Sequence, residues 1–233
     1  MLVRIESLGG ATQTERLSPT KTTFVVQTVP AAWEDATTYL RLGIEHILFG
    51  FDHLLFVLAL VILIGGWRRV ALTVTAFTIA HSITLAAATL GLVNLPRPPV
   101  EAAIALSIVL VAAEIVNARH GKPSLAARSP WLVAFCFGLL HGFGFAGALA
   151  EVGLPHHAIP IALLFFNVGV EIGQLVFVAV VLTAGEQFRR AIALGLKPVL
   201  VQRTVNRLDV SAAYVIGAVA AYWLIERTSA FFV

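Results

Sequence analysis

The sequence predicts an all-α protein, a polytopic bundle of about six transmembrane helices behind a short polar leader. Of the 233 residues, 58% are hydrophobic and only 12% are charged. Soluble domains contain about 45–50% apolar and about 25% charged residues. The mean hydropathy is +0.89. At about 20 apolar residues per span, the length leaves room for about six spans and little else. These values exclude an ordinary soluble domain, and they also exclude a disordered chain.

The first 36 residues are polar and rich in threonine, unlike the remainder of the chain. Within them, residues 22–29 are β-prone, and Pro30 ends that stretch. We expect residues 1–36 to form an extramembrane leader, or the tail of a β domain that begins before this sequence. Residues 37–233 are then the membrane domain.

Six apolar stretches follow, each bounded by glycine, proline or a cluster of charges. They cover residues 40–65, 70–92, 99–118, 131–150, 157–183 and 209–228. The first is long enough to include a turn outside the hydrocarbon, and its glycines would let neighbouring helices pack closely. Pro98 and Pro99 open the third. Between the last two, residues 184–208 are predicted to be a linker at the membrane surface.

Lysine and arginine residues in the loops predict the orientation. Most of them follow the first, third and fifth stretches. Because these residues collect on the cytoplasmic side of membrane proteins, we expect a multi-pass protein of the inner (cytoplasmic) membrane with both termini outside. The net charge of +3 is then a topology signal, and we expect no nucleic acid as a partner.

Acids and histidines lie inside the predicted spans, whereas no lysine or arginine does when Arg41 and Arg227 are counted at span edges. An ionised residue at a span centre costs roughly 2.5–3.5 kcal/mol and therefore needs a partner or a function. Acids without internal bases must be protonated, hydrated or neutralised by a bound cation, so this set favours a cation site. Its members are His46, His53, His81, His141, Glu45, Asp52, Glu101, Glu114 and Glu171.

The first span carries the densest cluster of these residues. His46 and His53 are seven residues apart, nearly two helical turns, so their rings are predicted to share one face. Glu45 and Asp52 have the same spacing on a neighbouring face. Imidazoles and a carboxylate are ligands that suit nickel, zinc and cobalt. The alternative is that these histidines are packed, hydrogen-bonded core residues.

The fourth and fifth spans carry two further polar features. Four glycines flank His141, which indicates either unwound backbone lining a cavity or close helix packing. Asn167, Glu171 and Gln174 fall at positions i, i+4 and i+7 and form a stripe that must face the bundle interior. Interhelical hydrogen bonding would explain the stripe equally, and Glu114 could simply cap or snorkel.

These segments resemble the HupE/UreJ family of nickel and cobalt permeases. The matching stretches are residues 43–56, 77–85, 100–107, 137–146 and 166–174. The resemblance covers residues 40 to about 230 and is closest to the branch that often carries an extracellular N-terminal domain. It implies a role in metal uptake for His46, Asp52 and His53, the His-x5-Asp-His pattern. Ile47 stands where the family often has proline.

We therefore expect a secondary permease for a divalent transition metal, with nickel or cobalt first and zinc or copper as further candidates. The lipid bilayer and the metal ion are the expected partners, no prosthetic group is expected, and a homo-oligomer stays open. The predicted metal ligands are His46, Asp52, His53, His81, His141 and Glu171. The secondary candidates are Glu45, Glu101, Glu114, Asn167 and Gln174.

Two other function classes stay open. An intramembrane hydrolase would use a metal-activated water or a Ser–His pair. His81 and Ser82 diverge by about 100° on a helix, which leaves Ser107 with His141 as such a pair. A metal-binding accessory protein would hold the ion without carrying it. The sequence contains no Gly-x4-Gly-Lys-Ser/Thr loop, so a gradient or a partner would drive any transport.

Overall fold

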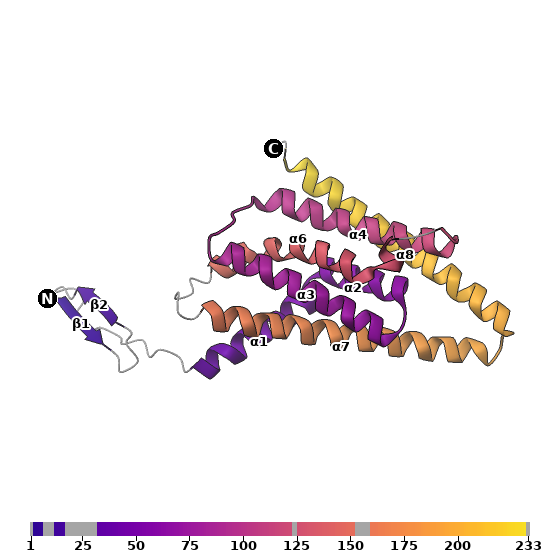
Figure 1. The fold of residues 1–233 in the computed structure, drawn as a ribbon, viewed down its shortest axis with the longest axis horizontal. Coiled ribbons are helices and arrows are strands. Elements are labelled where there is room, and N and C mark those ends of the chain that lie inside the picture. The colour runs from indigo at the N-terminus through magenta and orange to yellow at the C-terminus, as the bar shows by residue number, and fades with distance from the viewer. Residues whose placement is uncertain (1, 7–11, 17–31, 123–124, 152–158, 232–233) are drawn as a thin grey trace.

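The computed structural model describes residues 2–6, 12–16, 32–122, 125–151 and 159–231 (Figure 1). Near the N-terminus, β1 (Leu2–Glu6) pairs with β2 (Thr12–Arg16) in an antiparallel hairpin, with Leu2 opposite Arg16. Both strands precede the β-prone stretch 22–29, which lies outside the described residues.

The remaining described residues are almost entirely helical. The helices are α1 (Ala32–Phe49), α2 (Phe51–Ile64), α3 (Trp67–Thr89), α4 (Arg97–Arg119), α5 (Leu125–Arg128), α6 (Pro130–Glu151), α7 (Ile159–Ala193) and α8 (Pro198–Ser229). The helices α3, α4, α7 and α8 are each long and apolar enough to span a bilayer, α1 and α2 together make one broken span, and α6 is a shorter apolar helix. A helix of 23 residues is about 35 Å long, and the hydrocarbon core is about 30 Å thick. The predicted polytopic helical bundle of about six spans is therefore confirmed.

The first span is broken, where the sequence predicts one continuous stretch over residues 40–65. Helices α1 and α2 meet at an angle of 69°. Gly50 lies between them, and a Cβ atom added to it would come within 2.5 Å of the carbonyl oxygen of His46. Glycine at this position therefore lets the chain turn where a larger residue would collide with the preceding helical turn.

The predicted surface linker over residues 184–208 is also wrong. Helix α7 continues to Ala193, and α8 begins at Pro198. Proline suits that position because the first turn of a helix needs no backbone donor there. At 35 and 32 residues, both helices are longer than the about 20 residues a bilayer requires, so they extend past the hydrocarbon.

Three helix pairs dominate the packing: α3 with α6, α1 with α7, and α4 with α8 (Figure 1). Glycines of α6 make the contact between α3 and α6 close. A Cβ on Gly138 would lie 2.5 Å from the backbone oxygen of Phe77, and one on Gly142 would collide with the backbone oxygen of His81. Helix α6 is continuous through these glycines. Of the two explanations for the glycines around His141, close packing is thus the correct one for Gly138 and Gly142.

Candidate metal centre

Four histidines from four helices meet in the interior of the bundle. His46 lies in the last turn of α1, His53 in the first turn of α2, His81 in α3 and His141 in α6. The ring centroids of His46 and His53 are 4.6 Å apart, and those of His53 and His141 are 4.9 Å apart. The ring of His81 lies 6.0 Å from that of His46 and 6.1 Å from that of His53.

Three of these imidazoles are close enough to share one metal ion. One ring nitrogen from each of His46, His53 and His81 lies within 4.8 Å of the other two. Metal–nitrogen bonds of about 2.0–2.1 Å hold two tetrahedral ligand nitrogens about 3.3 Å apart. Small side-chain rotations would therefore close the three nitrogens around an ion.

Phenylalanine rings pack against His81 and His141. Phe166 stacks on His81 with centroids 6.5 Å apart, while Phe77 and Phe56 lie 5.0 Å and 5.2 Å from the ring of His141. All three phenylalanines are fully buried. They give the imidazoles apolar neighbours on part of their surface.

Asn167 determines which nitrogen of His81 carries the proton. The Asn167 amide donates from Nδ2 to the backbone oxygen of Leu163 at 2.8 Å, so its Oδ1 is the atom that faces Nδ1 of His81, at 3.3 Å. An amide oxygen only accepts, so Nδ1 of His81 must be the protonated nitrogen. Its Nε2 then has a free lone pair, and among the described residues that buried atom has no hydrogen-bond partner. Metal-binding histidines are oriented in the same way.

Ser107 fixes His141 by the same logic. The Ser107 hydroxyl donates its one hydrogen to the backbone oxygen of Ile104 at 2.6 Å. Its oxygen therefore accepts from Nε2 of His141, 3.2 Å away. The lone pair of His141 is then on Nδ1, which is buried and has no hydrogen-bond partner within the described part of the chain. His141 lies beside the three-histidine group, with its ring centroid 4.9 Å from that of His53, but it is not one of the three members.

A cavity of about 220 Å³, which we call the vestibule, adjoins the histidines. It lies beside the junction of α1 and α2, the beginning of α4 and the end of α8. Its lining consists of His46, Gly50, Asp52, His53, Glu101, Ile104, His141, Gly144 and Arg227. A cation would therefore meet the carboxylates and the imidazoles in the same space.

Asp52 is paired with a base, contrary to the prediction that the internal acids have none. Arg227 donates from Nη2 to Oδ2 of Asp52 at 2.9 Å and from Nη1 to the backbone oxygen of Glu101 at 2.9 Å. Arg227 lies in the last turn of α8, so it enters the bundle from a helix end. The sequence places it at a span edge but does not reveal its partner.

Glu171 and Gln174 lie between α3 and α7. Thr75 donates to Oε1 of Glu171 at 2.5 Å, and Thr78 donates to Oε1 of Gln174 at 2.9 Å. The predicted stripe thus faces a neighbouring helix, and through Asn167 it reaches His81. In the described part of the chain, Glu171 is not in the three-histidine group.

Glu45 and Glu114 do not contribute to the three-histidine group among the described residues, although Glu45 directly precedes His46. Glu45 forms an exposed ion pair with Arg41, four residues before it, at 2.7 Å. Glu114 is half-buried toward the C-terminal end of α4. Of the secondary candidates, Glu101 lines the vestibule and Asn167 contacts a histidine.

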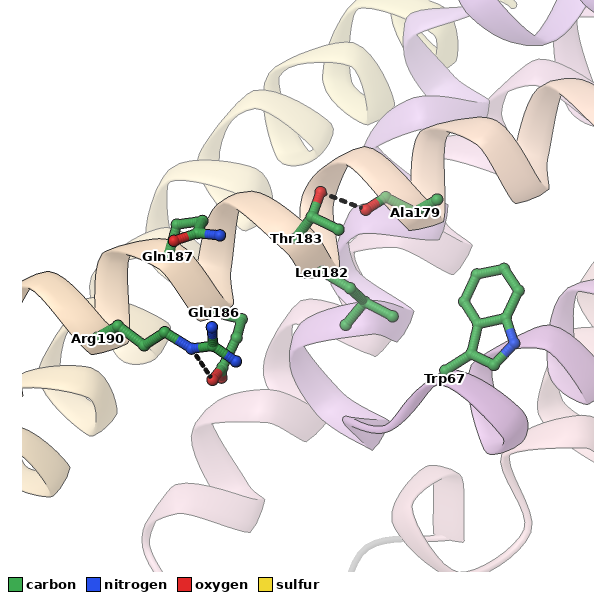
Figure 2. Close-up of a pocket in the computed structure, with 7 residues that line it drawn as sticks. All are labelled: Trp67, Ala179, Leu182, Thr183, Glu186, Gln187 and Arg190. Carbon is green, nitrogen blue, oxygen red and sulfur yellow. Dashed lines mark hydrogen bonds and ion pairs between the residues drawn. The ribbon is translucent and has the colours of Figure 1, made fainter.

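A larger pocket of about 350 Å³ lies beside the second half of α7 (Figure 2). Three of its polar side chains are already partnered: Arg190 donates to Glu186 at 2.8 Å, and Thr183 donates to the backbone oxygen of Ala179 at 2.7 Å. The seven lining residues include no histidine. Its volume is larger than that of the vestibule, but its chemistry is that of a solvated helix surface.

Sequence reasoning named Asn167 as a secondary metal candidate and Ser107 only as a possible hydrolase partner of His141. It missed Thr75 and Thr78 as partners of Glu171 and Gln174. Ser107 lies in one of the family-like stretches, but a serine in a span most often bonds to its own helix. Thr75 and Thr78 could likewise have bonded only to their own helix. Only the similar spacing of two hydroxyls on α3 and of a carboxylate and an amide on α7 could have suggested a pairing between these helices.

Comparison with protein-family models matches residues 20–227 to the family described as HupE / UreJ protein. No curated protein matches the chain, and no solved structure does. The family match covers nearly the whole sequence and confirms the resemblance. The chain belongs to the HupE/UreJ family, and it is a multi-pass membrane protein of the metal-transporter type.

Proposed function

We propose that this protein is a secondary permease that carries a divalent transition-metal cation, nickel or cobalt, through the histidine cluster. The observation that carries the proposal is the convergence of His46, His53 and His81, with ligand nitrogens within 4.8 Å of one another. Family membership supports nickel and cobalt as the first metals to test.

The ligand chemistry supports a transition metal over calcium or magnesium. Neutral imidazole suits nickel, copper, iron and zinc, whereas magnesium and calcium prefer oxygen ligands. The lone pair assigned to His81 Nε2 is buried beside two other imidazoles, and fully buried phenylalanines pack against the histidines. Three nitrogens leave coordination positions open, so a carried ion can exchange its ligands and depart.

Geometry weighs against the intramembrane hydrolase. A serine nucleophile must donate its hydrogen to the histidine base. Here Ser107 donates to Ile104, and His141 is the donor in the Ser–His contact. Family membership also points to transport or accessory roles. The accessory alternative predicts metal binding without flux.

Proteoliposomes containing a trapped nickel-quenched fluorophore test the proposal. We expect nickel-dependent quenching with the wild type and a loss of at least about 100-fold with His53→Ala, because removing one of three ligands should cost no less than the 10–100-fold that losing an outer partner of a ligand costs. His120→Ala is the matched control, since His120 is exposed and bonds only to its own helix at Val116 in the described structure. Equal rates for His53→Ala and wild type would refute carriage through the cluster. Nickel binding without flux would favour the accessory role.

A further inference from the structure

Arg227 is an unusual component of a cation site because it brings a permanent positive charge to the vestibule. Its guanidinium bonds to the carboxylate of Asp52 and to the backbone of Glu101, and its Cζ lies 5.5 Å from the ring centroid of Trp223. Both side chains of the ion pair are largely buried, at 20% and 23% exposure. Guanidinium does not deprotonate in proteins, so this charge persists at every physiological pH.

Of the residues that line the vestibule in the described part of the chain, Arg227 is the one arginine or lysine, and Asp52 and Glu101 are the two acids. The helix ends explain this arrangement, because the start of α4 lies beside the end of α8 (Figure 1). Without Arg227, two carboxylates would face one cavity with no fixed cation between them. Such a pair is the kind of oxygen site that magnesium, calcium and manganese bind.

We propose that Arg227 determines selectivity by occupying the Asp52 carboxylate and so keeping hard divalent cations out of the vestibule. The inference rests on the proposed function, since it concerns which cations reach the imidazoles. A transition metal gains enough from nitrogen ligands to bind beside a neutralised carboxylate. A hard cation, which gains little from imidazole, has no strong ligand while Arg227 is in place.

The chain contains a matched control for this arginine. Arg119 at the end of α4 pairs with Asp209 at 2.8 Å, with 29% and 20% exposure, and donates to the backbone oxygen of Ile62 at 2.9 Å. Arg119 therefore makes the same types of contact as Arg227 at similar burial, but it does not line the vestibule. Arg119→Gln therefore shows how the protein responds to losing such an ion pair and backbone hydrogen bond when the charge of the vestibule is unchanged.

The decisive experiment measures binding of Mn²⁺ by its electron paramagnetic resonance signal, using the purified full chain in detergent. Manganese is the probe because it prefers the same oxygen ligands as magnesium. We expect Arg227→Gln to bind Mn²⁺ on the order of tenfold more tightly than wild type, because a like charge is removed from beside a divalent ion. Arg119→Gln should match wild type. The gain should disappear in the double variant Asp52→Asn/Arg227→Gln.

Equal Mn²⁺ affinity in Arg227→Gln and wild type would overturn the proposal, as would a gain that survives Asp52→Asn. If Arg227→Gln does not elute as a folded protein, Arg227→Met takes its place, because its long apolar chain suits a membrane interior. In proteoliposomes, excess Mg²⁺ should slow nickel flux through the Arg227 variant and leave wild type unchanged. Absence of nickel flux in the wild type would refute the proposed function, whereas the manganese result depends on the vestibule alone.

Discussion

Replacing Asn167 with leucine tests the assigned tautomer of His81. The change removes the acceptor that holds the proton on Nδ1 but leaves the three imidazoles in place. His81 then exchanges between two tautomers, and only the one with a free Nε2 lone pair can bind a metal at the cluster. We therefore expect weaker nickel binding without loss of a ligand.

The contact distance sets the size of the effect. Loss of an outer partner of a metal-bound histidine costs 10–100-fold in affinity. The Nδ1–Oδ1 distance of 3.3 Å is longer than the usual 2.9–3.0 Å of a strong N–H···O bond. We accordingly expect the lower end of the range, about tenfold, which corresponds to about 1.4 kcal/mol.

Equilibrium dialysis of the purified protein against radioactive nickel measures this change. Asn206→Leu is the control, because Asn206 pairs with Gln202 on the exposed side of α8. Asn167→Asp should preserve or strengthen binding, since a carboxylate is a better acceptor for Nδ1–H. An unchanged Kd in Asn167→Leu, or an equal loss in the control, would refute the tautomer assignment.

Three further outcomes follow from the packing and the buried polar atoms. Gly142→Ala should destabilise the protein by about 1–3 kcal/mol, because its Cβ collides with the backbone of His81; Gly217→Ala, whose Cβ would meet its nearest neighbour at 3.5 Å, should leave the melting temperature nearly unchanged. Ser107→Ala should lower the free energy of unfolding by about 1–3 kcal/mol, because the buried N–H of His141 loses its acceptor. Retention of full stability would contradict the assigned hydrogen bond. Nickel at 100 times its Kd should stabilise the wild type by about 2.7 kcal/mol, and a melting curve that does not respond to nickel would argue against binding to the folded state.

The sequence predicts the class of fold because bilayer physics leaves so few alternatives. Long apolar stretches require helices with all backbone groups bonded internally, and the observed α3, α4, α7 and α8 follow from that requirement. Helix ends and breaks are harder to predict. Hydrophobic residues continue on both sides of Gly50, so the sequence does not show where the helix breaks. The 69° bend depends on how the neighbouring helices pack.

The candidate site was partly predictable for the same reason. Polar residues in spans must face the interior, which gathers His81, His141 and Asn167 without knowledge of the packing. Pairings between distant segments could not be predicted. The contact between Asp52 and Arg227 joins residues 175 positions apart, and neither hydropathy nor helical periodicity specifies which helix end meets which break.

The break at Gly50 has a mechanical consequence for a permease. His46 and His53 lie on opposite sides of it, one in each half-helix, so any change in the angle between α1 and α2 changes the separation of their nitrogens. In the proposed permease, an ion bound to both histidines would hold α1 and α2 at one angle. Ion occupancy and that angle would then be thermodynamically linked, so that a change in the angle would weaken ion binding and ion binding would oppose a change in the angle.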